Sequence, residues 1–271
     1  MALIIGLLIG ALLGLTGAGG SIFAVPLLIL LLQLDATAAS GIALGAVAAS
    51  ALFGAWRQRT LLMPTPILVL ALAGMAAAIP GRWSANHLPE LWLSLGFCAL
   101  ALVIALRMLQ QSRREPETAH FVRASPPEPK RPSAEPLCRL SPGGHFQLRP
   151  RCLGGLMIGG LIAGYLSGLF GVGGGFLIVP LLILLSSLSM PVAIANSLAI
   201  IAVISSSGFI TQVAINHFAL NPLIIHVLSG ALIGMFLSQR WSRNIAGAKL
   251  QMAFALALIA VAAMLAFRSL Y

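Results

Sequence analysis

The stretch from Gly168 to Leu185, "GLFGVGGGFLIVPLLILL", is the strongest indication of the fold, because the chain contains a close copy of it. Residues Gly14 to Leu31 read "GLTGAGGSIFAVPLLILL", and a constant offset of 154 residues aligns the two copies without a gap. Each copy places a glycine cluster inside an apolar run long enough to cross a bilayer. Irregular backbone at membrane depth is tolerated only where protein or a wet cavity surrounds it, and in transporters it often forms the substrate site. The sequence therefore predicts two broken membrane segments that build a site.

The composition excludes a soluble globule and predicts an all-α polytopic membrane protein. Of 271 residues, 59% are hydrophobic and 8% charged, and the mean hydropathy is +1.01. The net charge of +10 comes from basic residues that flank apolar runs, as orienting charges do, so we expect a lipid bilayer and no nucleic acid as partner. The N-terminal "MALIIGLLIGALLG" lacks a basic region ahead of its apolar run, and we expect it to be retained in the fold.

The apolar runs predict two halves of the same plan. The first half, 1–111, and the second, 152–271, flank a linker, 112–151, that is rich in proline and charge and cannot build a core. The repeat extends past the glycines, because "RWSAN" at Arg82–Asn86 recurs as "RWSRN" at Arg240–Asn244. Each half is expected to hold one broken segment and three helices, the segments at 2–34 and 153–188 and the helices at 36–56, 64–81, 90–110, 192–215, 221–240 and 249–268.

The spacing of glycines within the broken segments predicts a packing face. Glycines recur at every fourth residue before both breaks, which places them on one side of a helix and lets another backbone approach closely. These positions are Gly6, Gly10 and Gly14 in the first half and Gly160, Gly164 and Gly168 in the second.

The loop charges predict which way the halves lie. If each broken segment is a hairpin and the linker is cytoplasmic, the short interhelical loops carry five basic residues inside and one, Arg82, outside. If each broken segment crosses once, the short loops carry two basic residues inside and four outside. Because basic residues are enriched in cytoplasmic loops, the counts favour hairpins. Three full crossings per half then make the repeats inverted about an axis in the membrane plane, with both termini periplasmic.

The doubled glycine pattern, followed by "AIANSLAII" at 193–201, resembles the sulfite exporter TauE/SafE family of bacterial membrane proteins. The similarity covers the chain outside the linker. The first copy departs from the second, since Ser21 replaces the last glycine and Ala39-Ser40 stands where the second half has Asn196-Ser197. The resemblance implies transport of sulfite, organosulfonates or related small anions across the bacterial inner membrane, and it fixes neither the anion nor the direction.

The residues of the membrane segments independently favour an anion. Four of the six acidic residues lie in the linker, and Asp35 and Glu90 fall at predicted helix ends, so no carboxylate is available for a cation or proton relay. Glycine-loop amides and the N-termini of the second half-helices carry partial positive charge and bind anions. The predicted substrate-binding residues are Gly171, Gly173, Gly174, Gly175, Asn196 and Ser197, with Gly17, Gly19, Gly20 and Ser40 in the first half.

The remaining polar side chains support more than one interpretation. His226, inside a predicted helix, is a candidate for proton coupling or a neutral histidine bonded to a neighbouring carbonyl. Cys98, Cys138 and Cys152 have no metal-ligand spacing and predict no disulfide framework, so neither metal nor cofactor is expected. An alternative function is that of an intramembrane hydrolase, with Ser167 or Ser205 as nucleophile and His226 or His217 as base. A passive anion channel and a scaffold that works through its linker are two competing functions, and a homodimer is left open.

Overall fold

The computed structural model is almost entirely helical, and its helices follow the predicted segments closely. It describes residues 1–17, 19–114, 138–140, 146–147, 150–186, 188, 190–216, 222–241 and 248–270. In chain order the elements are α1 (Ala2–Thr16), the 3₁₀ turn η1 (Gly19–Phe23), α2 (Ala24–Leu32), α3 (Ala36–Arg57), η2 (Arg59–Leu61), α4 (Pro64–His87), α5 (Glu90–Arg114), α6 (Pro150–Phe170), α7 (Gly175–Leu185), α8 (Met190–Asn216), α9 (Pro222–Trp241) and α10 (Ala248–Leu270). Two short strands, β1 (Arg139–Leu140) and β2 (Phe146–Gln147), pair antiparallel ahead of α6.

The protein is a multi-pass membrane protein. Among the described residues, five helices are long and apolar enough to cross a bilayer by length and composition, namely α3, α4, α6, α8 and α9. Both glycine stretches break their helices as predicted: α1 ends before Gly17, whose φ is +81°, and α6 ends before Gly171, whose φ is +71°. Leu181 and Leu185 of α7 lie against glycines of α6, so the second broken segment folds back as a hairpin.

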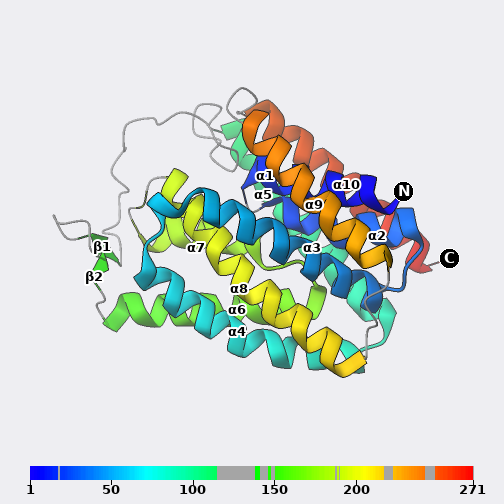
Figure 1. Cartoon of the computed structure of the whole chain (residues 1–271), viewed down its shortest axis with the longest axis horizontal. Coiled ribbons are helices and arrows are strands. Elements are labelled where there is room, and N and C mark those ends of the chain that lie inside the picture. The colour runs from blue at the N-terminus through cyan, green and yellow to red at the C-terminus, as the bar shows by residue number, and fades with distance from the viewer. Residues whose placement is uncertain are drawn as a thin grey trace.

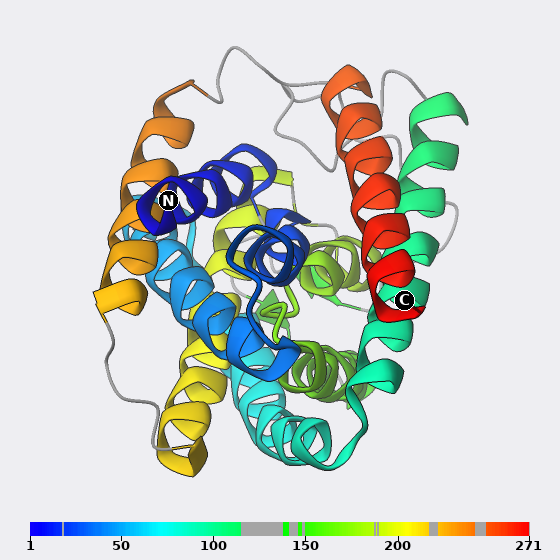
Figure 2. The same cartoon turned by 90° about the vertical axis from the view of Figure 1, so that its right-hand side faces the viewer.

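Helices of the first half pack mainly against helices of the second half. Helix α1 packs on α9, and their repeat counterparts α6 and α4 pack on each other, while α3 crosses α8 in the middle of the molecule (Figure 1). Helices α5 and α10 run side by side at one edge (Figure 2). Each of these contacts joins one half of the chain to the other. That the repeats are inverted about an axis in the membrane plane stays the prediction made from the loop charges.

The spaced glycines form the predicted packing faces. A Cβ built on Gly10 would lie 1.9 Å from the carbonyl oxygen of Ala231 in α9. In the other half, a Cβ on Gly164 would lie 2.0 Å from the carbonyl oxygen of Gly74 in α4. Both contacts are with backbone, so these helices approach as closely as they do only because no side chain stands between them.

Two predictions made from the sequence are wrong. Cys138 and Cys152 form a disulfide, and the amide of Cys138 donates to the carbonyl oxygen of Leu185 at 2.9 Å, so the end of the linker is bonded to both arms of the α6–α7 hairpin. Disulfides persist in oxidising compartments, which opposes the cytoplasmic linker that the loop charges predict. The second error concerns α4, which was expected to end at 81 but continues through Pro80 and Gly81 to His87.

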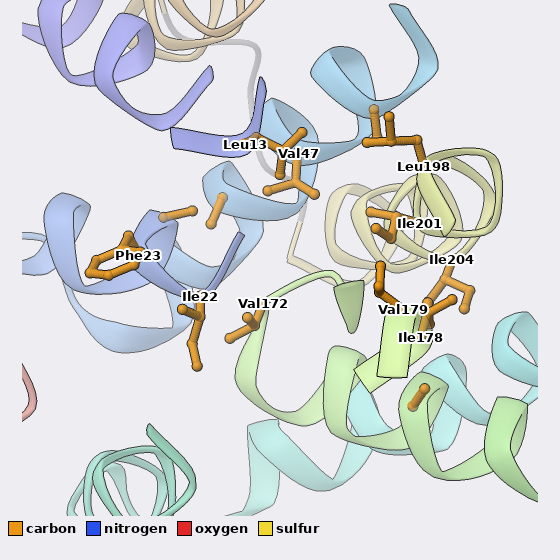
Figure 3. Packing of buried hydrophobic residues seen from close by; sticks show 14 of the residues in the cluster. Leu13, Ile22, Phe23, Val47, Val172, Ile178, Val179, Leu198, Ile201 and Ile204 are labelled. Carbon is orange, nitrogen blue, oxygen red and sulfur yellow. The ribbon is translucent and has the colours of Figure 1, made fainter. Parts of the chain in front are cut away.

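The two glycine breaks meet in the interior. Figure 3 shows Ile22 of η1 beside Val172 of the second glycine loop, with Val47 of α3 and Ile201 of α8 close by. All four side chains are at most 2% exposed. The breaks therefore lie at the centre of the apolar core, where α3 and α8 enclose the irregular backbone.

Candidate functional site

A cavity with a volume of about 30 Å³ lies where the first half meets the end of α6. By the same measure one water needs roughly 10–15 Å³, so the cavity has room for a ligand of a few atoms. Most of its wall is apolar, and its polar groups come from α3, α4 and α5. The lining residues are Val25, Ile29, Ala36, Thr37, Ser40, Arg82, Ala85, Leu93, Ser94, Phe97, Leu169, Phe170 and Leu265.

Arg82 is the charged group of this cavity, and it is fully buried, with 0% of its surface exposed. Its Nη1 donates to Ser40 Oγ at 2.6 Å, and its Nη2 donates to the carbonyl oxygen of Thr37 at 3.1 Å. The loop charges predict Arg82 as an orienting charge outside the membrane, in the loop after a helix that ends at 81. Helix α4 instead extends past Gly81 to His87 and carries the guanidinium into the interior of the protein.

The carbonyl oxygen of Thr37 fixes the arginine in place. It accepts hydrogen bonds from Ser40 Oγ at 2.9 Å and from Gln212 Nε2 at 3.3 Å, in addition to the bond from Arg82. Gln212 belongs to α8 of the second half and is only 1% exposed. The position of Arg82 therefore depends on contacts from both halves of the chain.

Arg82 lacks a compensating charge within the part of the chain that the structure describes. It forms no ion pair there, and its Nε has no hydrogen-bond partner. A buried charge is expensive unless it is paired, and neutral hydrogen bonds to a hydroxyl and a carbonyl do not neutralise it. Guanidinium groups bind oxyanions well because their planar N–H donors match two oxygens at once. The geometry therefore suits a small anion.

The second glycine loop adjoins this cavity. A Cβ on Gly171 would lie 2.2 Å from Ser40 Cβ, so the loop contacts the serine that binds Arg82. Gly171, Gly173 and Gly174 have φ values of +71°, +77° and +67°, in the left-handed region that favours glycine. The fold thus needs glycine here both for backbone conformation and for the close approach to α3.

The structure brings only some of the predicted site residues to this place. Ser40 lines the cavity and Gly171 contacts it. Asn196 is buried and bonded to backbone on three sides: its Oδ1 accepts from the Met63 amide at 2.7 Å, and its Nδ2 donates to the carbonyls of Leu61 and Val192. Ser197 Oγ donates to the carbonyl of Ile194 at 2.8 Å. Neither Asn196 nor Ser197 lines the cavity.

In the first glycine loop, a backbone amide is hydrogen-bonded by a side chain at the end of α1. Gly20 donates from its amide to Thr16 Oγ at 2.6 Å, and Thr16 Oγ donates to the carbonyl of Leu12. A Cβ on Gly17 would lie 2.6 Å from Ile194, so this glycine lies against α8. Gly19 begins η1. These three glycines are outside the lining of the cavity.

His226 and the serines do not come together. His226 is exposed on α9, and its Nδ1 is 2.5 Å from the carbonyl oxygen of Pro222 one turn earlier. Ser167 and Ser205 are fully buried, and neither hydroxyl has a hydrogen-bond partner among the described residues. The Ser–His pair that a hydrolase would need is therefore not formed with His226, and His217 lies outside the described residues.

Sequence reasoning missed Arg82, Thr37 and Ser94. The signal for Arg82 was the repeated "RW" at 82–83 and 240–241, which marks equivalent positions in two helices. The two arginines nevertheless differ, because Arg240 is exposed whereas Arg82 is buried. The repeat alone could not distinguish them.

The comparisons with known proteins cover almost the whole chain. The family model described as "Sulfite exporter TauE/SafE" matches residues 2–265. Two curated proteins of Xylella fastidiosa, from strains Temecula1 and 9a5c, are each named "Probable membrane transporter protein" and are 28% identical to this chain over 273 and 270 residues. In both cases the alignment covers 97% of this chain and 92% of the relative. No solved structure matches.

Proposed function

The chain belongs to the sulfite exporter TauE/SafE family of membrane transporters, and we propose that it moves a small anion by binding it at Arg82. The substrate class is a sulfur oxyanion, such as sulfite or a small organosulfonate, or a related anion. The membrane is the bacterial inner membrane. The protein acts as a secondary transporter and not as an enzyme.

The observation that carries this proposal is the buried guanidinium without a carboxylate partner among the described residues. Arg82 donates to a hydroxyl and a carbonyl, and its Nε remains available to a ligand. An anion that enters the cavity would neutralise the charge and accept the remaining N–H donors. Charge-assisted hydrogen bonds of this kind contribute about 1.5–3 kcal/mol each.

The cavity supports a small substrate. A volume of about 30 Å³ fits a compact anion better than an extended one. Apolar walls from Leu93, Phe97 and Phe170 exclude competing water, which strengthens the electrostatic attraction to Arg82. Ser94 adds a hydroxyl that can donate to a further oxygen of the anion, whereas the hydroxyl hydrogen of Ser40 is already donated to the carbonyl oxygen of Thr37.

The position of the glycine loop supports a role for the predicted site beside that of Arg82. The sequence predicts that loop amides and helix N-termini hold the anion, together with Asn196, Ser197 and Ser40. In the proposal made here Arg82 supplies the charge, and the loop that begins at Gly171 borders the site through Ser40. Asn196 and Ser197 stay predictions as substrate residues, and His226 stays a prediction as a coupling group.

Uptake by proteoliposomes tests the proposal. Vesicles that contain the purified protein are supplied with sulfite, sulfate, thiosulfate and small sulfonates at pH 6 and pH 8, and the initial rates are measured. At least one anion should show saturable uptake. Arg82→Gln keeps hydrogen-bonding capacity but removes the charge, and it should weaken the apparent affinity by about 10- to 100-fold.

Arg240→Gln is the matched control, because Arg240 occupies the equivalent position of the second "RW" motif and is exposed. It should transport like the wild type. The proposal fails if no anion is taken up at either pH. It also fails if Arg82→Gln and Arg240→Gln both retain wild-type affinity.

A further inference from the structure

We propose that the start of α7 is a second anion position, formed by the hydroxyls of Ser167 and Ser205 and the first-turn amides of α7. The inference rests on the proposed function, since the anion is the one that Arg82 binds. It adds a place to which that anion passes along the glycine loop.

The start of α7 is a buried helix N-terminus without a side-chain cap. Its N-cap is Gly174, which has no side chain to accept a hydrogen bond, and the helix of 11 residues begins at Gly175. Both glycines are buried. The amides of Leu177 and Ile178 donate to the carbonyl oxygen of Gly174, which leaves the amides of Gly175 and Phe176 at the helix start to an acceptor from elsewhere. The helix dipole adds partial positive charge at the same place.

Two unpartnered hydroxyls flank this N-terminus. A Cβ on Gly173 would lie 2.7 Å from Ser205 Oγ, and a Cβ on Gly174 would lie 3.3 Å from Ser167 Cβ. Both serines are 0% exposed, and neither hydroxyl has a partner among the described residues. Buried hydroxyls in helices commonly bond the carbonyl one turn earlier, as Ser50 does in α3. Ser167 and Ser205 do not.

The first repeat lacks the two serines and supplies an acceptor for its own loop amide, although α2 also begins without a side-chain cap. At the position of Phe170 it has Thr16, whose hydroxyl accepts the loop amide of Gly20 at 2.6 Å, so the first loop supplies its own acceptor. The position of Ser167 is occupied by Leu13, and that of Ser205, when Ser40 is aligned with Ser197, by Ala48. The donors therefore gather only in the copy whose loop has no such threonine, which a packing role common to both repeats would not require.

The groups at this position indicate the class of ligand. Amides donate only, and hydroxyls can donate, so the complementary ligand is one that accepts several hydrogen bonds, such as a small oxyanion. Val47 and Ile201 line the other side of Gly173 and are fully buried, so water is excluded. The nearest neighbours of Gly173 and Gly174 include no charged side chain, and the atom nearest to a Cβ on Gly174 is the carbonyl oxygen of Ala163, an acceptor, at 2.9 Å. The second position should thus bind more weakly than Arg82 and release the anion.

The glycine loop connects the two positions. Gly171, at its first residue, contacts Ser40, which bonds Arg82. Gly173 and Gly174, at its end, contact the two serines. A short stretch of mostly glycine backbone therefore leads from the cavity to the start of α7.

The test compares Ser167→Ala, Ser205→Ala and the double variant with Ser50→Ala, a buried serine whose hydroxyl bonds its own helix. Melting temperature without substrate, the shift of that temperature by sulfite or thiosulfate, and the maximal uptake rate are measured. We expect the double variant to melt at or above the wild-type temperature, because the removed hydroxyls had no partner. It should keep the anion-induced shift that Arg82 provides and lose at least about tenfold in maximal uptake rate.

Each outcome decides one of the two proposals or both. If the double variant transports at the wild-type rate and only Arg82→Gln loses anion binding, the second anion position is overturned and the proposed function stands. A double variant that melts lower than Ser50→Ala assigns the serines to packing and also overturns it. If the wild type shows neither an anion-induced shift nor uptake, both proposals fail together.

Discussion

Replacing Gly164 with alanine should push α6 away from α4 and destabilise the protein. The new Cβ would lie 2.0 Å from the carbonyl oxygen of Gly74 and 2.5 Å from its Cα. Both atoms belong to the backbone, so no side-chain rotation relieves the overlap, and the helices must separate by about 1.5 Å to restore ordinary contact. Overpacking of this kind costs about 1–3 kcal/mol.

The same helix provides the matched control. A Cβ on Gly154 would meet no atom within 4 Å. Gly154→Ala should therefore leave stability unchanged or raise it by up to about 1 kcal/mol through helix propensity. For a chain of this size 1 kcal/mol corresponds to about 2–4 °C, so Gly164→Ala should melt roughly 2–12 °C below the wild type.

Melting is followed in detergent by the fraction of protein that stays monodisperse on size exclusion after heating. The displacement also has a functional consequence, because α4 carries Arg82 and the end of α6 contributes Leu169 and Phe170 to the cavity. Gly164→Ala should thus raise the KM for anion uptake, and Gly154→Ala should not. Equal melting temperatures for the two variants would refute the packing argument.

Contacts outside the cavity support three further predictions. Cys138→Ser removes a disulfide between residues 14 positions apart and should lower the free energy of unfolding by about 3 kcal/mol. Reductant should destabilise the wild type by the same amount, and identical melting of oxidised and reduced protein would contradict this. Asn196→Ala leaves the Met63 amide and the Leu61 carbonyl without their partner and should lower the melting temperature, at about 1–3 kcal/mol per buried group. Unchanged melting with a raised KM would contradict this structural role and support Asn196 as a substrate residue. A cytoplasmic linker, as the loop charges predict, implies that Cys138 and Cys152 are thiols in living cells, and a disulfide trapped by rapid thiol blocking of intact cells would reverse the predicted sidedness.

The helical plan was readable from the sequence because it depends on local properties. Apolar runs of sufficient length predict membrane helices, and glycine clusters predict their breaks, so α3, α5, α8, α9 and α10 begin and end within a few residues of expectation. The four-residue glycine spacing likewise predicted close packing, which Gly10 and Gly164 confirm. Each inference needs only the neighbours of a residue along the chain.

The site was only partly readable because its groups meet through tertiary contacts. Proline and glycine at 80 and 81 normally end a helix, and α4 was expected to stop there. Packing of α4 on α6 continues the helix past them, since Gly81 lies against the backbone of Tyr165. The residues gained, 82–87, include Arg82, which thereby changes from a loop charge into a buried one.

The amino-acid sequence is sufficient to predict a two-repeat membrane protein whose glycine stretches interrupt its helices, because hydropathy, length and backbone freedom are properties of short segments. Tertiary contacts determine which glycine loop lies beside unpartnered hydroxyls and which arginine is buried. Arg82 is buried and Arg240 exposed although both belong to one repeated motif, and the first loop is capped by Thr16 where the second has Phe170. Equivalent sequence positions acquire different chemistry because burial and hydrogen bonding depend on the partner helix, which only the packed fold supplies.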